Sequence, residues 1–152
     1  SKNSLRWMRV EETLMTKKIE GGCLCGAVRY ESDAEPLFAV NCHCRHCQMT
    51  SGSTHLPGIG LPEAAFSLTG DLTWYKITND RGGKSMRAFC PTCGTPIMGQ
   101  IEGEALVFLH VITLDDPSGY PPQMDIFESS AQPFDRFDDA LPRFPKMPPM
   151  GE

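Results

Sequence analysis

Hydrophobic and polar residues alternate along most of this chain, in short runs that glycine, proline and asparagine separate. Alternation with a period of two is typical of strands that bury one face, and the breaks between the runs are typical of turns. No run keeps the three-to-four-residue spacing of a long amphipathic helix. The predicted strands are Ala27–Glu31, Leu37–Val40, Phe66–Leu68, Leu72–Thr78, Ser85–Phe89, Pro96–Gln100, Ala105–Ile112 and Met124–Phe127.

Turn residues and one helix signal complete this pattern. Asn79–Gly83 and Glu102–Glu104 each separate two predicted strands and are predicted as hairpin turns. Arg45–Thr50 is predicted to form one or two helical turns that end at Gly52. Residues 53–61 carry three glycine or proline residues, so we expect a loop there. The sequence therefore predicts a mainly β fold of short strands with short helical turns.

The length of 152 residues suits one domain with a buried core. We expect residues 1–20 to form a peripheral N-terminal arm, either disordered or folded as a short helix, and residues 21–148 to form a single domain. Proline is frequent from Ala131 onward, so we expect an extended segment that lies on the surface of the domain.

Composition excludes several classes of partner. Hydrophobic residues make up 40% of the chain, charged residues 22%, and the formal net charge is −5. There is no basic tract of the kind that binds nucleic acid. No apolar run approaches the roughly 20 residues of a membrane span, and the first residues lack the pattern of a secretory signal. These features favour a cytoplasmic protein that binds neither nucleic acid nor a membrane.

Cysteine is the most informative residue type. There are seven cysteines, an odd number, which argues against a closed disulfide framework. Two of the motifs contain a C-x-C pair, whose members rarely meet disulfide geometry with each other. A reduced metalloprotein is the better interpretation. The cysteines divide into a set of four, which is Cys23, Cys25, Cys90 and Cys93, and a set of three, which is Cys42, Cys44 and Cys47.

The set of four joins a C-x-C motif to a C-x-x-C motif, each followed by glycine. Four thiolates in two such pairs form the ligand set of a closed, tetrahedral structural zinc site. Because the two motifs lie far apart in the sequence, such a site would fasten the first strand of the domain to its central hairpin. The alternative is a group of buried cysteines without a metal ion.

The set of three has the spacing C-x-C-x-x-C. The C-x-C pair places two sulfurs on one side of an extended segment, and the third cysteine follows within one turn. Three ligands leave one position of a tetrahedral zinc site open, which is typical of catalytic or ligand-binding sites. Two alternatives remain: a closed site with a fourth ligand from His43, His46, His55 or His110, or no metal at all.

The ligand set limits the chemistry of such an open site. Three thiolates donate charge to zinc, so the ion is a weaker activator of water than one held by neutral histidines. A thiol bound in the open position is deprotonated, and the thiolate is the nucleophilic form of sulfur. We therefore expect a small thiol substrate that attacks an electrophilic carbon. His43 lies between two ligands and should point away, whereas His46 and His55 are the candidate catalytic residues that face the site.

Three motifs in this order resemble the glutathione-dependent formaldehyde-activating enzyme family, which includes centromere protein V. They are GGCLCG, NCHCRHCQMTSGS and WYK followed by SMRAFCPTCGTPI. The segment MDIFESSAQPFDRFDDALPRFP is similar to the C-terminal signature of that family. The resemblance covers residues 20–148. The chain departs from the family pattern at Phe127 and Phe134, where tryptophan is frequent, and at Arg45.

The resemblance implies a β-tent fold with two zinc ions per chain. By position, the set of four matches the structural zinc site of the family, and the set of three matches the site where glutathione and metal bind together. The implied reaction is the condensation of formaldehyde with glutathione to S-(hydroxymethyl)glutathione, which is a carbon–sulfur lyase reaction in reverse. Cationic partners for the glutathione carboxylates would come from Arg45, Arg81, Lys84 and Arg87. The alternative function is a non-catalytic zinc module that binds a thiol or a protein partner.

Overall fold

The computed structural model describes residues 18–148, so the residues before Lys18 in the expected N-terminal arm lie outside the described part of the chain. Within residues 18–148 the protein is mainly β, with one short α-helix, which confirms the predicted fold class. The elements are β1 (Ile19–Gly22), β2 (Arg29–Ser32), β3 (Phe38–Cys42), α2 (Arg45–Ser51), β4 (Leu56–Pro62), β5 (Phe66–Thr69), β6 (Thr73–Thr78), β7 (Lys84–Phe89), β8 (Pro96–Ile101), β9 (Leu106–His110) and β10 (Met124–Ile126). Four 3-10 turns complete the list: η1 (Glu63–Ala65), η2 (Val111–Thr113), η3 (Pro117–Gly119) and η4 (Glu128–Ser130).

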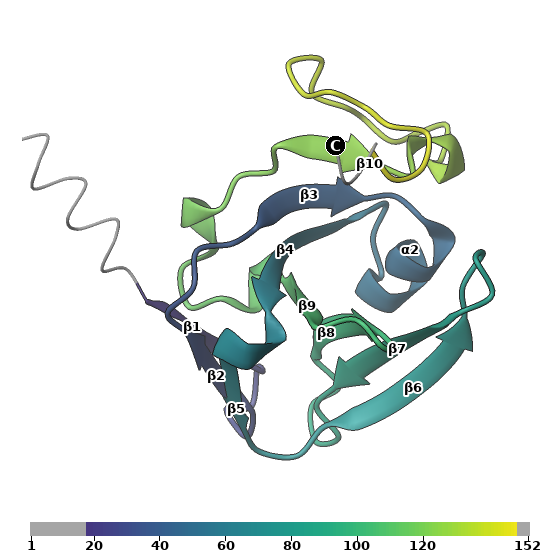
Figure 1. Cartoon of the computed structure of the whole chain (residues 1–152). Helices are drawn as coiled ribbons and strands as arrows, with labels where there is room; N and C mark the ends of the chain where they lie inside the picture. Colours follow the sequence, from purple (N-terminus) through teal and green to yellow (C-terminus); the bar gives the residue numbers. More distant parts are fainter. Residues whose placement is uncertain (1–17, 149–152) are drawn as a thin grey trace, which may run out of the picture.

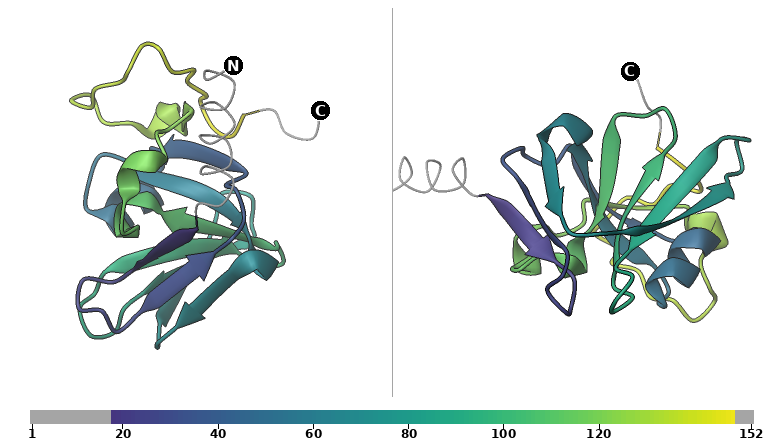
Figure 2. Two further views of the ribbon diagram at one scale, coloured as in Figure 1. Left: turned by 90° about the vertical axis from the view of Figure 1, so that its left-hand side faces the viewer. Right: turned by 90° about the horizontal axis from the view of Figure 1, so that it is seen from below.

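The strands form two sheets. A seven-stranded sheet has the order β10-β3-β4-β9-β8-β7-β6, and a three-stranded sheet has the order β1-β2-β5. All pairings are antiparallel except that of β10 with β3, which is parallel. The larger sheet is strongly curved, and α2 lies on its concave side between β3–β4 and the β6–β7 hairpin (Figure 1). The three-stranded sheet lies beside the other face of the larger sheet (Figure 2).

The main core fills the space between the two sheets. The side chains in it that are 0% exposed include Val28, Ile59, Leu61, Ile97 and Leu109. Burying one such side chain contributes roughly 1.5–3 kcal/mol to stability, so this core holds the sheets together. A second, smaller apolar cluster lies on the opposite side of β4 and includes Val40, Leu56 and Ile126. The three-cysteine motif belongs to this second cluster, because Cys42 and Cys47 are buried in it.

Strand β4 corrects the loop predicted for residues 53–61. The segment is a central strand, paired with β3 on one side and β9 on the other. A Cβ atom on Gly58 would lie 2.1 Å from the Phe108 ring, and one on Gly60 would lie 2.5 Å from the Phe38 ring. The two glycines therefore let phenyl rings from the neighbouring strands lie across β4. Glycine occurs both in turns and in strands that a neighbouring side chain approaches closely, so composition alone does not distinguish the two cases.

The other predicted elements agree with the structure in type. The helical prediction is confirmed by α2, whose C-cap is Gly52 in the left-handed conformation (φ 70°). The hairpin turns of residues 79–83 and 102–104 are confirmed by the β6–β7 and β8–β9 pairings. Strand β1 was not predicted: Ile19 and Glu20 are paired in it, and the Ile19 side chain is 2% exposed.

The segment after η4 runs along the edge of the large sheet. Backbone hydrogen bonds join Asp125 to Pro142 and Phe144, and Phe127 to Lys146. Asp125 and Arg143 also form an isolated parallel bridge. This segment covers the free edge of β10, which would otherwise present unpaired backbone groups. The prediction of an extended surface segment is thus confirmed, and the segment also closes over the second cluster.

Candidate functional site

The set of four cysteines converges from two loops. Cys23 and Cys25 follow β1, while Cys90 and Cys93 lie between β7 and β8. All four sulfur atoms lie within 4.8 Å of one another. The Sγ atoms of Cys23 and Cys25 are 3.6 Å apart, and those of Cys25 and Cys90 are 3.8 Å apart. This group will be called the four-cysteine cluster.

The geometry of the four-cysteine cluster fits a tetrahedral metal ion. A Zn–S bond of about 2.3 Å places the sulfurs of a tetrahedral site roughly 3.8 Å apart, as found here. Backbone N–H groups of Val28 and Thr92 donate to Cys23 and Cys90, as expected for sulfurs that carry negative charge. The Thr95 hydroxyl lowers the pKa of the Cys93 thiol to about 5. A metal ion held here would join the three-stranded sheet to the large sheet.

The set of three cysteines lies where β3 passes into α2. Cys42 ends β3, Cys44 is the N-cap of α2, and Cys47 lies within the helix. The Cys44 sulfur accepts a hydrogen bond of 3.4 Å from the backbone N–H of Cys47. The three sulfur atoms lie within 4.8 Å of one another, so they can hold one metal ion together. This group will be called the three-cysteine cluster.

The thiols of the three-cysteine cluster stabilise one thiolate among them. Hydrogen bonds from the thiols of Cys42 and Cys47 lower the pKa of Cys44 to about 2, and the charge of Arg87 acts in the same direction. The hydrogen bond to Cys44 raises the pKa of Cys42 above its ordinary value. A compact group of sulfurs that readily carries negative charge is the donor set that soft cations such as zinc prefer. The cluster therefore fits a metal ion of this kind.

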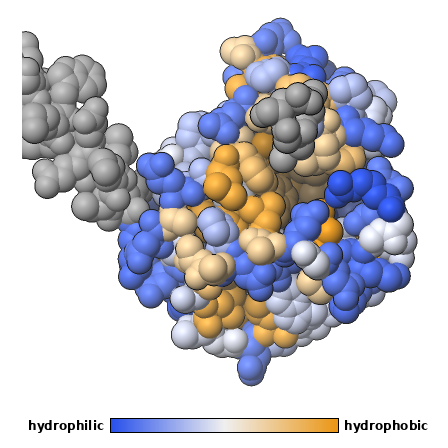
Figure 3. Space-filling model, in the orientation of Figure 1, coloured by the Kyte–Doolittle hydropathy of each residue, from blue (hydrophilic) through white to orange (hydrophobic). Residues whose placement is uncertain are grey.

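A pocket of about 620 Å³ opens beside the three-cysteine cluster, and all three of its cysteines line the pocket. The space-filling view shows a recess on this face, with apolar side chains around it (Figure 3). The four-cysteine cluster contributes no residue to this pocket. The three-cysteine cluster thus forms part of the pocket wall, and Cys44 is the most exposed of its three cysteines.

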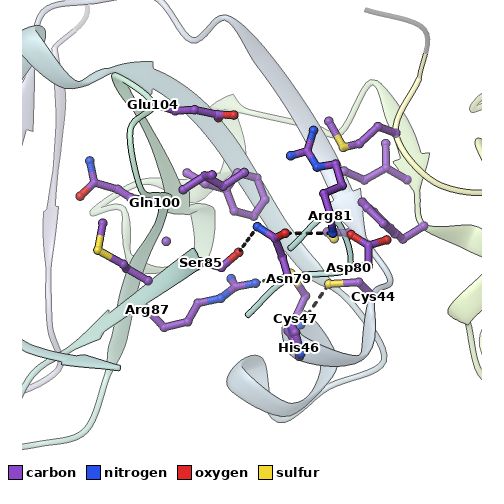
Figure 4. Close-up of a pocket in the computed structure, with 18 of the residues that line it drawn as sticks. Cys44, His46, Cys47, Asn79, Asp80, Arg81, Ser85, Arg87, Gln100 and Glu104 are labelled. Atoms are coloured by element: carbon purple, nitrogen blue, oxygen red, sulfur yellow. Dashed lines mark hydrogen bonds between the residues drawn. The ribbon is translucent and has the colours of Figure 1, made fainter. Parts of the chain in front are cut away.

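Arg87 brings positive charge to this pocket. Its Nη2 donates to the sulfur of Cys47 over 3.4 Å, and in the close-up its guanidinium group points toward α2 (Figure 4). The side chain crosses the neighbouring strand at Gly99, where a Cβ atom would lie 3.2 Å from Nη1. The Nε atom is buried and has no hydrogen-bond partner among the described residues. A buried donor without a partner is uncommon, and here it lies on a group that faces a ligand-sized pocket.

The other cations named from the sequence differ in position. Arg45 and Arg81 line the pocket, whereas Lys84 does not.

Arg45 donates from Nη1 to the side-chain oxygen of Gln48 over 2.7 Å. The amide nitrogen of Gln48 in turn donates to the backbone oxygens of His43 and Ser130. This buried amide therefore fastens α2 to the segments on either side of the three-cysteine cluster.

His43 points away from the cysteines, as expected from its place in the motif. Its Nε2 is 2.8 Å from Oδ1 of Asp125, and its Nδ1 is 2.9 Å from Oδ2 of Asp135. The ring is 1% exposed and also packs against the rings of His55 and Phe137. Ligand atoms of His43, His55 and Asp135 lie within 4.8 Å of one another, but the carboxylates already occupy both nitrogens of His43. We interpret this group as a clamp that holds the backbone between Cys42 and Cys44.

The two candidate catalytic histidines occupy different places. His46 is exposed on the first turn of α2 and lines the pocket. His55 is absent from the residues that line the pocket; its Nδ1 lies 3.1 Å from the hydroxyl of Thr54, and burial lowers its pKa. His110 is buried on β9, where burial and then the charge of Arg87 lower its pKa to about 3.

The sequence did not identify Asp125 and Asp135. Both lie in the C-terminal segment and reach His43 across more than 80 residues of sequence. Asp125 alone offered a signal, because it stands between two apolar residues of a predicted strand. A buried carboxylate in such a strand requires a polar partner.

Two comparisons with known proteins gave matches. A family model described as "Glutathione-dependent formaldehyde-activating enzyme" matches residues 18–130. A crystal structure of a Rhodobacter sphaeroides protein is 24% identical, with a TM-score of 0.52, and the match covers 66% of this chain and 93% of that chain. At this identity the likeness concerns the fold. No curated protein matches the sequence. Within residues 18–148 there is no helix long and apolar enough to cross a bilayer.

Proposed function

Because the chain belongs to the glutathione-dependent formaldehyde-activating enzyme family, we propose that it is a zinc-dependent, carbon–sulfur lyase-like enzyme acting on a small thiol adduct. The default pair of reactants is glutathione and formaldehyde, which combine to S-(hydroxymethyl)glutathione. The single observation that carries this proposal is the position of the three-cysteine cluster at the wall of a pocket large enough for a small molecule.

The two cysteine clusters are proposed to hold one zinc ion each. The four-cysteine cluster supplies a complete tetrahedral ligand set, so its role is structural. Zinc held by Cys42, Cys44 and Cys47 would keep a bound substrate thiol in its thiolate form. The hydrogen bond from Arg87 to the sulfur of Cys47 draws negative charge away from the ligand set. Arg87 thus favours the binding of a further anionic sulfur at this cluster.

The proposed reaction forms one bond and moves one proton. The thiolate sulfur attacks the carbonyl carbon, the S–C bond forms, and the electrons of the C=O π bond move to oxygen. His46 lines the pocket next to the cysteines, so we assign it the role of giving a proton to the new alkoxide. His55 packs against His43 instead, so we assign it no role in the proton transfer. Holding both reactants in one pocket supplies most of the acceleration.

A reducing location is part of the proposal. All seven cysteines are free, and both clusters need thiolates rather than disulfides. The cytoplasm keeps thiols reduced and contains glutathione, so we propose that the protein acts there.

Exchange NMR of glutathione–formaldehyde mixtures tests the function. The adduct forms without an enzyme, so the measured quantity is the exchange rate between free and adduct formaldehyde with and without micromolar protein. We expect faster exchange with the wild-type protein and a return toward the uncatalysed rate with His46→Gln. A zinc module without catalytic activity would bind glutathione and leave the exchange rate unchanged, and that result would contradict the proposal.

A further inference from the structure

The pocket beside the three-cysteine cluster has two chemically different halves. The order of strands in the large sheet separates them, since β10, β3 and β9 lie toward one edge and β8 and β7 toward the other. The first half is lined by Phe38, Leu106, Phe108, Ile126 and Phe127. The second half carries most of the polar side chains, including Asn79, Arg81, Ser85, Arg87 and Gln100, beside the apolar Met86 and Ile101.

The cysteines lie where the two halves meet. Cys42 ends β3 in the apolar half, and Cys47 accepts a hydrogen bond from Arg87 in the polar half. A reaction at these sulfurs therefore has a polar wall on one side and an apolar wall on the other. A thiol that carries carboxylate, ammonium and amide groups finds its partners on the polar wall, where donors and charges are available. The apolar wall is left to the second reactant.

The apolar wall is a built feature of the fold. The rings of Phe38 and Phe108 lie across Gly60 and Gly58 of β4, with centroids 6.4 Å apart. Glycine at both positions is what allows the rings to lie against the strand and leaves the pocket open above them. A strand interior tolerates glycine poorly, so two glycines here need a packing reason.

Phe127 provides a second observation. Among residues 18–148 it is the only non-glycine residue with a positive φ, at 55°. A bulky side chain rarely adopts this conformation, which persists only where the surrounding structure enforces it. The hydrogen bond from the Phe127 N–H to the Lys146 oxygen fixes the backbone there, and the ring lines the pocket. The fold thus maintains a strained residue that adds one more aromatic ring to the apolar wall.

Formaldehyde offers nothing for this wall to contact. It has two heavy atoms and no apolar chain, and a molecule of that size occupies roughly twice the 30 Å³ of a water molecule. We propose that the second reactant is an aldehyde with an apolar chain of about four to seven carbon atoms, an inference that rests on the proposed addition of a thiol to a carbonyl. The chain lies against Phe38, Phe108 and Phe127, and the carbonyl carbon lies at the cysteines. The product is the corresponding hemithioacetal: the S–C bond forms, the C=O π bond breaks, and the thiol proton ends on oxygen.

A series of straight-chain aldehydes tests this substrate class. Exchange NMR with glutathione and aldehydes of one, two, four and six carbons gives the protein-dependent acceleration for each. Burying one methylene group strengthens binding about fourfold, so kcat/KM should rise roughly fifteenfold from two to four carbons and level off when the wall is filled. Acceleration of formaldehyde exchange without a larger effect for hexanal would overturn the inference and leave the proposed function standing. Acceleration of no aldehyde would overturn both.

Two variants and a binding measurement assign the effect to the apolar wall. Phe127→Gly removes the ring and suits the positive φ, which offsets part of the packing that the second cluster loses, so the hexanal-to-formaldehyde ratio of the folded variant should fall about tenfold. Phe134→Ala removes an exposed phenylalanine, 68% accessible, from the segment after η4 and should leave the ratio unchanged. Hexan-1-ol, which cannot react, should bind saturably and shift the NMR signals of the pocket rings. An unchanged ratio in Phe127→Gly, or no binding of hexan-1-ol, would contradict the proposed role of this wall.

Discussion

Arg87 donates from Nη2 to the sulfur of Cys47 over 3.4 Å, which links the β7–β8 hairpin to the three-cysteine cluster. The contact places a permanent positive charge beside thiolates at the wall of the pocket. Because the four-cysteine cluster lies at the β7–β8 connection, the same hairpin serves both clusters. Cys90 follows β7 directly, after a register shift between Ala88 and Phe89 that redirects the strand. One hairpin thus anchors the fold and supplies a charge to the candidate reactive site.

Arg87→Met should weaken metal binding at the three-cysteine cluster. The substitution keeps much of the side-chain length but removes the charge and the donor to Cys47. Loss of an outer partner of a metal ligand typically costs 10–100-fold in affinity, so we expect at least a tenfold rise in the zinc dissociation constant. Competition with a chromophoric chelator, at a zinc level that leaves the four-cysteine cluster filled, measures this constant.

Arg81→Met is the matched control for this prediction. Arg81 lines the same pocket from the β6–β7 turn, and no hydrogen bond from its side chain to a cysteine is found within residues 18–148. We expect its zinc affinity to equal that of the wild type. If Arg87→Met binds zinc as tightly as Arg81→Met, the hydrogen bond to Cys47 has no role in holding metal.

Cys90→Ser and Cys44→Ser should have different effects on folding. Cys90 belongs to the cluster that joins the two sheets, so its loss removes metal-linked folding energy on the order of several kcal/mol. Cys44 belongs to a cluster that spans only residues 42–47 and closes no long loop, so its loss should leave a folded protein with one zinc ion and no thiol binding. Thermal unfolding and metal analysis of each variant measure both effects. Equal destabilisation by the two substitutions would mean that both clusters are structural.

Sequence patterns identified the two clusters because thiolate spacing is a local property. A C-x-C or C-x-x-C motif restricts where its sulfurs can lie, whatever the remainder of the chain does. The division into four and three cysteines followed from spacing alone and agrees with the sulfur distances. The short helix before Gly52 was predictable for the same reason, since its capping signal is local.

Contacts between distant segments could not be predicted in this way. Gly58 and Gly60 indicated a loop in the sequence. In the structure, glycine is needed at these positions because a phenyl ring from a neighbouring strand lies against each of them. Asp135 reaches His43 from a proline-rich segment with no periodic pattern. The sequence offered four candidate cations and gave no reason to prefer Arg87 among them. Only the pairing of β7 with β8 places Arg87 opposite Gly99 and next to Cys47. Each of these features depends on the register of strands rather than on local composition.

Gly58→Ala should destabilise the protein. The new Cβ atom would lie 2.1 Å from the Phe108 ring, so the ring must leave its position across β4. Overpacking of this kind costs about 1–3 kcal/mol, and urea unfolding measures the change in free energy. Adding Phe108→Leu should reduce the cost of Gly58→Ala, since the smaller side chain removes the clash.

Gly83→Ala provides the control for backbone effects of the glycine substitution. Gly83 lies in the exposed β6–β7 turn, where a Cβ atom would come no closer than 3.4 Å to the side chain of Asn79. We expect a change in unfolding free energy within about 0.5 kcal/mol, as is usual for surface substitutions. A loss as large as that of Gly58→Ala would show that the phenyl ring is not the cause.

His110 should make stability depend on pH. Burial and then the charge of Arg87 lower its pKa from 6.5 to about 3 in the folded protein. Between these two values the unfolded chain binds a proton at this residue and the folded protein does not, so stability falls as the pH falls. One such group contributes at most about 1.4 kcal/mol per pH unit, and its full contribution to stability is present above pH 6.5.

His110→Leu isolates this contribution, because leucine has no titrating group and suits a buried position on β9. The measurement is the unfolding free energy of both proteins in urea at pH 7.5, 6 and 5. Acid also protonates the cysteine ligands, but this affects both proteins, so the difference between them reports His110. We expect the wild type to lose stability relative to the variant by about 1 kcal/mol per unit below pH 6. Parallel pH profiles for the two proteins would show that His110 takes up a proton equally in the folded and unfolded states.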